Sequence, residues 1–242
     1  MTRNLFRYTI ILLLFIITLC CNRTDKKLCD NHYIKGTNYA MSFEFDSSLD
    51  EFDQAIIEDP YNASAFCGKG SIALINGEFD NAIKEYDTAI QINPDLAFAY
   101  LHRATACSFN GQYNKSISDL TKAIKLKPDL FYLYLLRANN RYTVGDNKGA
   151  IEDITKAIEL NKNCVNAYFY RALFYRDSNN PKLALADINK AIELKTDNVT
   201  IYALKGYCEY LLGMKEEACM DFNKGKENGD SSAVAYINSY CK

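Results

Sequence analysis

The sequence predicts an all-helical protein made of six tandem helix-turn-helix units and a closing helix. Three observations lead to this fold class: a 34-residue period, small side chains at fixed places, and bulky side chains at helical spacing. The period runs in one register from about residue 29 to residue 232 of the 242 residues. A helix-turn-helix unit of this length buries its apolar face only by stacking on copies of itself, so we expect a single solenoid domain.

Small side chains recur at three places in every unit. The eighth place holds Gly36, Gly70, Ala104, Ala138, Ala172 and Gly206. The second column holds Ser48, Ala82, Ser116, Ala150, Ala184 and Ala218, and the third holds Ala55, Ala89, Ala123, Ala157, Ala191 and Gly225. Small side chains let two helix backbones approach closely, so these columns predict the contacts between helices.

Bulky side chains form two further columns. The first contains His32, Phe66, Tyr100, Tyr134, Tyr168 and Tyr202, and the second contains Phe52, Tyr86, Leu120, Ile154, Ile188 and Phe222. They stand three, four or seven residues from the small ones, which is the stripe of an amphipathic helix.

Turn residues mark the helix ends. The fifteenth place holds Gly77, Gly111, Gly145, Asn179 and Gly213, and in the first unit it holds Phe43. Glycine and asparagine tolerate the left-handed backbone that ends a helix, so the first helix of each unit should end there. Proline cannot continue a helix, and the second helix should end before Pro60, Pro94 and Pro128.

Opposite charges also repeat. Basic residues stand just before the small eighth residue, and an aspartate follows each of them sixteen residues later. The pairs are Arg103 with Asp119, Arg137 with Asp153, Arg171 with Asp187, and Lys205 with Asp221. This spacing places each base on the first helix and each acid on the second, where partly buried charges are best tolerated as pairs. A pair that recurs in successive units indicates a structural role rather than a catalytic one.

Together these residues resemble the tetratricopeptide repeat family over about five-sixths of the chain. The resemblance implies a right-handed α-solenoid of six repeats with a C-terminal closing helix. The implied repeats are residues 29–62, 63–96, 97–130, 131–164, 165–198 and 199–232, and the closing segment is residues 233–242. The packing is harder to predict at Arg141 and Glu209, which stand where the first and fifth repeats have Tyr39 and Tyr175.

The resemblance also implies a concave groove for a partner, lined by the second, fifth, ninth and twelfth places of each repeat. Among the residues at these places are Phe98, Leu101, Tyr132, Leu135, Asn139, Tyr142, Asn166, Phe169, Leu173, Tyr207 and Tyr210. Family members that grip a C-terminal carboxylate use Lys and Asn there, and only Asn139 and Asn166 match. Tyrosine offers a large contact area at a low entropy cost, so we expect an apolar or aromatic peptide segment as the partner. The alternative is that neighbouring repeats cover these rings.

The N-terminus predicts a secretory signal. Arg3 and Arg7 precede an uncharged apolar run from Tyr8 to Cys21, which is short for a membrane span. The run ends in a sequence similar to the cleavage box of bacterial lipoproteins. We expect residues 1–20 to be removed, Cys21 to receive lipid and residues 21–28 to form a tether, with Cys20 as the alternative lipid site. The competing interpretation is an uncleaved membrane anchor.

Nine cysteines are present, and some could pair in an oxidising envelope. Cys208 and Cys219 are the first candidates because they stand at matching heights on the two helices of one repeat, and Cys241 is a competitor for either. The simpler interpretation is that the cysteines are small buried apolar residues. The chain has no C-x-x-C motif and two histidines, so we expect no bound metal.

The net charge and the absence of catalytic motifs argue against two classes of function, nucleic-acid binding and catalysis. Removal of residues 1–20 changes the net charge from −2 to about −4, and basic and acidic residues alternate, which argues against nucleic acid as a partner. The chain has no catalytic triad order, phosphate loop or metal motif, so we expect neither catalysis nor a cofactor.

We therefore expect a lipid-anchored protein of the cell envelope that binds a partner protein in its groove. A more specific alternative, by fold analogy alone, is a lipoprotein that assembles an outer-membrane, pilus or secretion complex. A weaker alternative is an accessory subunit of an envelope enzyme.

Overall fold

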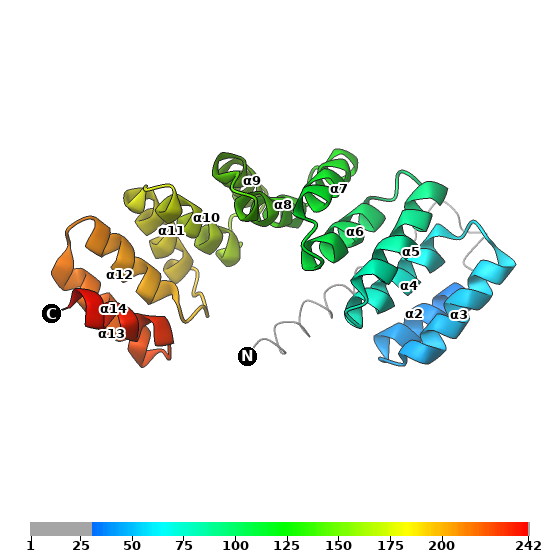
Figure 1. Cartoon of the computed structure of the whole chain (residues 1–242), viewed down its shortest axis with the longest axis horizontal. Coiled ribbons are helices and arrows are strands. Elements are labelled where there is room, and N and C mark those ends of the chain that lie inside the picture. The colour runs from blue at the N-terminus through cyan, green and yellow to red at the C-terminus, as the bar shows by residue number, and fades with distance from the viewer. Residues whose placement is uncertain (1–30, 242) are drawn as a thin grey trace. The chain divides into compact units, whose positions relative to one another are not determined.

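The structure of the chain is a computed structural model that describes residues 31–241. These residues form thirteen α-helices and no strand (Figure 1), which confirms the all-helical fold predicted from the repeat. No helix within this range is long and apolar enough to cross a membrane. The predicted signal, the tether and both candidate lipid sites, Cys20 and Cys21, lie outside the described residues.

The helices belong to two compact units that divide between Pro128 and Asp129. The described part of the first unit contains α2 (Asn31–Met41), α3 (Phe45–Glu58), α4 (Ala63–Ile75), α5 (Phe79–Ile92), α6 (Ala97–Phe109) and α7 (Tyr113–Leu126). The second unit contains α8 (Phe131–Thr143), α9 (Asn147–Leu160), α10 (Val165–Asp177), α11 (Pro181–Glu193), α12 (Ile201–Leu211), α13 (Lys215–Glu227) and α14 (Ser231–Tyr240). Consecutive helices pair within each 34-residue repeat, and α14 follows the last pair.

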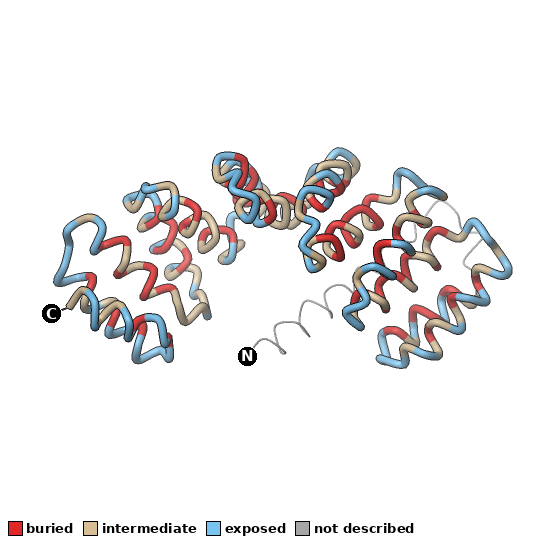
Figure 2. Tube along the Cα trace, viewed as in Figure 1, coloured by how far each residue is buried: buried red, intermediate tan, exposed pale blue. Residues whose placement is uncertain are grey.

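The two helices of a pair are held by a large ring packed over a small residue. A Cβ atom added to Gly70 would lie 2.9 Å from the Tyr86 ring, and one added to Gly206 would lie 2.8 Å from the Phe222 ring. Either contact is too short for a real side chain, so the small column is a packing requirement, as the sequence predicted. Figure 2 shows buried residues along the helices and exposed residues concentrated at the turns between them.

The first unit contains one closer approach, between successive repeats. Phe52 packs against Gly36 of its own repeat, and a Cβ atom added to Gly68 of the next repeat would lie 2.4 Å from the same ring. Phe52 is fully buried as a result. Gly68 is outside the three small columns, so the sequence pattern did not indicate this contact.

The turn inside each pair is left-handed in all six repeats. The φ angle is positive at Gly77, Gly111, Gly145, Gly213, Asn179 and Phe43. No heavy atom lies within 4 Å of a Cβ built on Gly77, so backbone conformation rather than space favours glycine there. Phe43 adopts the same conformation with a φ of 62°, at a cost of about 1 kcal/mol for a residue with a side chain. The fifteenth place therefore ends the first helix, as predicted.

The second helix of a repeat ends in two ways. The residues before Pro60, Pro94 and Pro128 have φ between −131° and −141°, which a following proline favours, and Asn161 after α9 is extended in the same way without a proline. No proline follows α11, and there the backbone turns at Lys195, whose φ is 61°. The amide of Thr196 donates to the carbonyl of Ala191 at 3.1 Å, which closes the helix end. As a result α12 begins at Ile201 rather than near the predicted repeat boundary at Val199.

The closing helix α14 occupies the position of the first helix of a seventh repeat. Its Ala233 and Tyr236 stand 34 residues after Val199 and Tyr202, and the helix packs against α13 and α12. It begins at Ser231, two residues before the predicted start. At the eighth place, where every complete repeat has glycine or alanine, α14 has Tyr240.

Candidate partner-binding face

The strongest candidate surface lies on α8 and α10 of the second unit, which are in direct contact. Tyr132, Leu135 and Phe169 are half-buried, and Asn139 and Asn166 are exposed. We call these five residues the aromatic face. Leu135 and Phe169 also pack against the core of the second unit, so only part of each side chain is open to a partner. The aromatic face therefore combines fixed apolar side chains with two free amide groups.

Tyr142 is more strongly engaged within the unit than the sequence indicated. Its ring stacks on Phe174 with centroids 4.5 Å apart, and its hydroxyl donates to the carboxylate of Asp177. The neighbouring Arg176 donates to the same carboxylate at 2.6 Å. The hydrogen bond to Asp177 raises the pKa of Tyr142. Burial would raise the pKa of Asp177, but the hydrogen bonds from Arg176 and Tyr142 outweigh it and lower the pKa. Tyr142 therefore stands at the edge of the aromatic face as part of a polar cluster.

Tyr207 and Tyr210 on α12 both contact α14, which leaves Tyr207 half-buried and Tyr210 37% exposed. The ring of Tyr236 lies 5.5 Å from that of Tyr207, and the ring of Tyr240 lies 4.2 Å from that of Tyr210, centroid to centroid. The closing helix, rather than a neighbouring repeat, therefore shields part of these two rings. The sequence analysis predicted the closing helix but did not place it against Tyr207 and Tyr210.

The two predicted groove residues of the first unit differ in exposure. Phe98 on α6 is half-buried, whereas Leu101 is 3% exposed. Leu101 offers almost no surface to a partner, so the prediction that it lines a groove is wrong. It belongs to the buried face of α6 with Tyr100 and Ala104.

The four predicted charge pairs form, in the third to the sixth repeat, and they fix the two helices of a pair. Arg103 donates two hydrogen bonds to Asp119, at 2.8 and 2.5 Å, and Arg171 donates two to Asp187, both at 2.7 Å. Lys205 donates to Asp221 at 2.5 Å. Forked contacts of this kind hold a guanidinium in one orientation. We call the basic residue of each repeat the clasp base.

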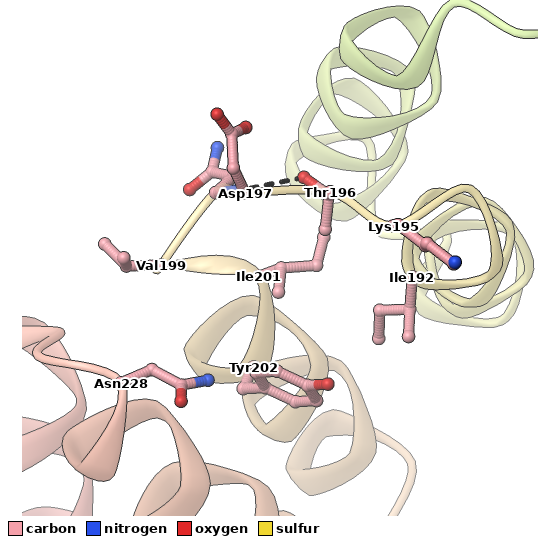
Figure 3. Close-up of a pocket in the computed structure, with 9 residues that line it drawn as sticks. Ile192, Lys195, Thr196, Asp197, Val199, Ile201, Tyr202 and Asn228 are labelled. Atoms are coloured by element: carbon pink, nitrogen blue, oxygen red, sulfur yellow. Dashed lines mark hydrogen bonds between the residues drawn. The ribbon is translucent and has the colours of Figure 1, made fainter.

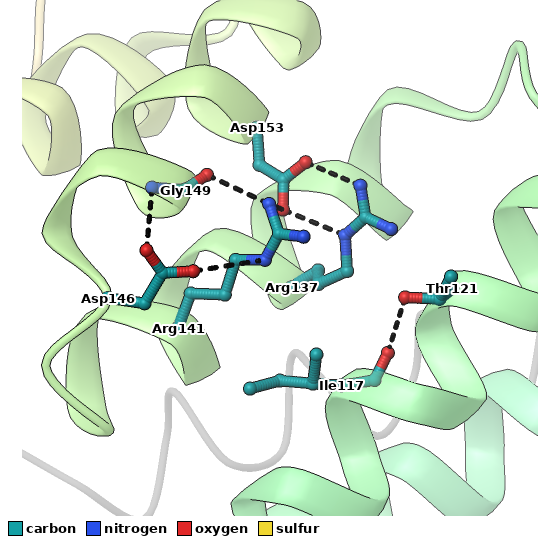
Figure 4. A network of polar contacts seen from close by, with 7 residues as sticks. All are labelled: Ile117, Thr121, Arg137, Arg141, Asp146, Gly149 and Asp153. Atoms are coloured by element: carbon teal, nitrogen blue, oxygen red, sulfur yellow. Dashed lines mark hydrogen bonds and ion pairs between the residues drawn. The ribbon is translucent and has the colours of Figure 1, made fainter.

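Figure 4 shows the clasp of the fourth repeat, where two arginines share one buried acid. Arg137 donates to Asp153 at 2.8 and 2.6 Å, and Arg141 approaches the same carboxylate at 3.0 Å. Arg141 also donates to the carbonyl of Gly149 at 3.1 Å and lies 3.7 Å from Asp146. Arg141, whose packing the pattern left open, therefore replaces a tyrosine by reaching the second helix.

The clasp bases also reach the preceding repeat, which the sequence analysis missed. Arg103 donates to Asp87 at 2.6 Å, and Lys69, an unpredicted member of the column, lies 2.7 Å from Asp53. Arg171 donates to the hydroxyl of Thr155 at 3.1 Å. Each acceptor stands sixteen residues before its base. The sequence therefore contained the signal, because this is the same interval that separates the base from the aspartate that follows it. Burial would lower the pKa of Arg103, but its bonds to Asp119 and Asp87 outweigh this and raise it.

The disulfide in the structure is not the Cys208–Cys219 pair that the sequence analysis favoured. Cys219 is bonded to Cys241, with Cα atoms 5.7 Å apart, and Cys208 is a free thiol. The Cys208–Cys219 prediction is therefore wrong, and the competitor Cys241 takes the bond. Cys208 faces the core that α12 shares with α10 and α11, where burial raises its pKa to about 11.

Within residues 31–241, no group of three or more His, Cys, Asp or Glu side chains is placed to hold a metal ion.

The α11–α12 linker borders an open cavity of about 430 Å³, shown in Figure 3. Ile192, Ile201 and Tyr202 form its apolar wall, and Lys195 and Asn228 stand at its edge. A hydrogen bond of 3.1 Å from the amide of Asn198 to the hydroxyl of Thr196 shapes the linker. The cavity follows from the late start of α12 and contains none of the residues predicted to bind a partner.

Comparison with protein families agrees with the repeat pattern. A model described as TPR repeat matches residues 70–107, and two described as Tetratricopeptide repeat match residues 99–130 and 135–199. Together these matches cover just over half of the chain. No curated protein matches the sequence.

Several solved structures share the fold. PilF of Pseudomonas aeruginosa has a TM-score of 0.74 at 15% identity, over 87% of this chain and 96% of that one. YrrB, described as a TPR protein with an unusual peptide-binding site, has a TM-score of 0.69 at 18% identity, over 78% and 97%. MamA has a TM-score of 0.64 at 24% identity, over 68% and 96%. These structures share the fold, and the family matches to residues 70–130 and 135–199 show that the chain is a tetratricopeptide repeat protein.

Proposed function

We propose that this chain is a protein-binding scaffold that holds an apolar or aromatic segment of a partner on the aromatic face of the second unit. The observation that supports it is the set of half-buried side chains Tyr132, Leu135 and Phe169 on two adjacent first helices. A ring that is fixed by its own core loses little entropy when a partner covers its open side. Asn139 and Asn166 are exposed beside these rings and can pair with the backbone of a bound segment.

YrrB, which shares the fold, is described as having a peptide-binding site. This supports a peptide as the ligand class, while the choice of residues rests on the aromatic face itself. Repeat proteins of this kind bind without catalysis, and we extend that role to this chain.

We further propose that the scaffold is attached to a membrane of the cell envelope through lipid on Cys21, with Cys20 as the alternative. The apolar N-terminal run and the cysteines at its end support this. A lipid anchor concentrates the scaffold near partners at the membrane, which raises the encounter rate without any new contact. Labelling cells with a palmitate analogue should mark the wild type and the Cys20→Ser variant but not Cys21→Ser. Label on Cys21→Ser but not on Cys20→Ser would move the anchor to Cys20.

Site-specific photo-crosslinking in cells tests the binding proposal. A photoreactive amino acid at Asn139 or Asn166 should capture the same partner band, because both stand on the aromatic face. The same group at Met220, which is 65% exposed on α13, is the matched control and should not capture it. The Tyr132→Ala, Phe169→Ala double variant should lose the band while its circular dichroism stays unchanged. Equal capture from Met220, or capture that survives the double variant, would place the binding surface elsewhere.

A further inference from the structure

The closing helix α14 covers a part of the surface that the repeat pattern assigns to partner binding. Tyr236 and Tyr240, one helical turn apart on α14, stack against Tyr207 and Tyr210 on α12. Tyr236 also lies 5.2 Å from Phe222 of α13, centroid to centroid. The chain thus places its own aromatic helix on the last repeat.

Two contacts at opposite ends hold α14 in place besides these rings. At its start, Ala233 is fully buried, and a Cβ atom added to Gly225 of α13 would lie 3.2 Å from the Cβ atom of Ala233. At its end, the disulfide joins Cys241 to Cys219 of α13. Ala233 is the one buried residue of the helix, and no side-chain hydrogen bond or ion pair joins residues 231–240 to α12 or α13. The ring contacts of Tyr236 and Tyr240 and the packing of Ala233 are therefore the non-covalent contacts that hold α14, and the disulfide adds a covalent link at its end.

We propose that α14 is a redox-controlled latch over the aromatic surface of the last repeat. With the disulfide intact, α14 packs on Tyr207, Phe222 and part of the Tyr210 ring. With the disulfide reduced, α14 leaves this surface for part of the time and exposes it to a partner helix that carries two aromatic residues one turn apart, as α14 does. This inference rests on the proposed scaffold function and adds its regulation.

The switching step is a thiol–disulfide exchange with a protein dithiol as reductant. One thiolate of the reductant attacks a sulfur of the Cys219–Cys241 bond, which breaks as a mixed disulfide forms. The second thiol of the reductant then displaces the cysteine of this chain. Two electrons and two protons pass to Cys219 and Cys241, which become thiols, and the reductant becomes a disulfide.

The expected size of the effect follows from the loop that the disulfide closes. The two cysteines are 22 residues apart, and a crosslink of that length favours the closed state by about a hundredfold. Reduction should therefore raise the opened fraction of α14 by about that factor, while the remaining helices keep their packing.

Hydrogen exchange of the full chain, oxidised and reduced with dithiothreitol, measures this opening directly. The amides of α14 should exchange about a hundredfold faster after reduction, and those of α8 to α11 should not change. The Cys241→Ser variant should behave as the reduced protein does without added reductant. Cys164→Ser is the matched control, because Cys164 is a free thiol and its loss should leave α14 protected.

A fluorescent reporter gives an independent measurement. The chain has no tryptophan, so Tyr240→Trp introduces a single emitter against Tyr210. Reduction should shift its emission to the red and increase quenching by iodide. Unchanged exchange in α14 together with unchanged emission would overturn the latch. Equal loss of protection in α12, α13 and α14 would also overturn it, because the disulfide would then support the whole last repeat.

Partner capture separates this inference from the proposed function. A photoreactive amino acid at Tyr210, which α14 contacts, should capture more partner in the Cys241→Ser variant than in the wild type. If capture is equal in both and still depends on Tyr132 and Phe169, the scaffold function stands and the latch does not regulate it. If the Tyr132→Ala, Phe169→Ala variant still captures the partner, the proposed function fails even when the exchange experiment shows the latch opening.

Discussion

The two units fasten successive repeats in different ways, although both contain repeats with the same base-to-aspartate clasp. In the first unit, Lys69 and Arg103 each reach a carboxylate of the preceding repeat, Asp53 and Asp87. In the second unit, Arg171 reaches the hydroxyl of Thr155. The bond inside a repeat is therefore the part that the two units share, and the bond between repeats is the part that differs. Ionic strength should affect the junctions of the first unit more than those of the second.

The largest expected effect is the loss of the acid that two arginines share in the second unit. Asp153→Ala leaves Arg137 and Arg141 without their common buried partner. We expect a loss of about 3–5 kcal/mol in the free energy of unfolding, because removing one partner of a buried ion pair is costly. Chemical denaturation checks this, with the exposed Glu152→Ala on the same helix as a control. A loss as small as that of the control would show that water solvates both arginines.

The next effect distinguishes the units by pH. His102 in the first unit is buried with no hydrogen-bond partner on either ring nitrogen, and burial lowers its pKa to about 4. The unfolded chain binds a proton near pH 6.5 and the folded chain does not, so stability is full above 6.5 and falls as the pH drops towards 4. The loss should reach about 3 kcal/mol, and His102→Leu should remove it. Chemical denaturation at pH 7 and at pH 4 gives the free energy of unfolding of the wild type and of His102→Leu. An equal loss of stability in the two proteins at pH 4 would contradict the prediction.

The second unit has no histidine, and its buried Glu209 should respond in the opposite direction. Burial raises the pKa of Glu209 despite the hydrogen bond from Lys205. The folded state therefore binds this proton more tightly than the unfolded chain, and its stabilising contribution is lost as the pH rises through the folded pKa. Glu209→Gln should remove that dependence. Hydrogen exchange in α12, compared with α6 over the same pH range, shows whether the two units diverge.

A smaller effect concerns the packing between repeats. Gly68→Ala would push a methyl group to within 2.4 Å of the Phe52 ring, so we expect a loss of about 1–3 kcal/mol from overpacking. The sixth place of a repeat holds Leu136, Tyr170 and Leu204 in the second unit. Leu136→Ala should act by the opposite mechanism, through lost contact rather than crowding. Thermal unfolding of Phe52→Leu, Gly68→Ala tests this, because the smaller side chain should recover part of the loss caused by Gly68→Ala.

The smallest effect measures the junctions themselves. Asp87→Ala removes a partly exposed ion pair, and we expect a loss of about 1 kcal/mol at low salt that shrinks as salt is added. Thr155→Ala removes a hydrogen bond from the same place of the fourth repeat, and its loss of about 0.5–1 kcal/mol should not depend on salt. Denaturation at two salt concentrations compares them, and the same salt dependence in both would remove the distinction between the units.

Features that repeat were predictable from the sequence, and features that interrupt the repeat were not. The pairing of Arg103 with Asp119 followed from spacing alone, because the same interval occurs in four repeats. The late start of α12 arises at one junction, where no proline follows α11 and Lys195 takes a left-handed turn. A feature that occurs at one junction produces no recurring residue type at a fixed place of the repeat, so the sequence pattern does not reveal it.

The candidate site was predictable as a set of places but not as a surface. Tyr207 and Tyr210 stand at the expected positions, yet α14 packs against both rings, and Leu101 is buried. Repeat register indicates the direction of a side chain, whereas its exposure depends on what packs beside it. The disulfide was missed for the same reason, since Cys208 faces the core while Cys219 faces α14.

Tyr240 has a consequence for how this protein associates with itself. An array of identical units presents at its end the same surface that each unit offers to the next, and such a surface can add another copy head to tail. The helix α14 takes the position of a seventh first helix, but a second helix could not approach it closely, because a tyrosine stands where every complete repeat has glycine or alanine. The aromatic side chain therefore prevents a further helix from docking closely on α14 in the way that the second helix of a complete repeat docks on the first.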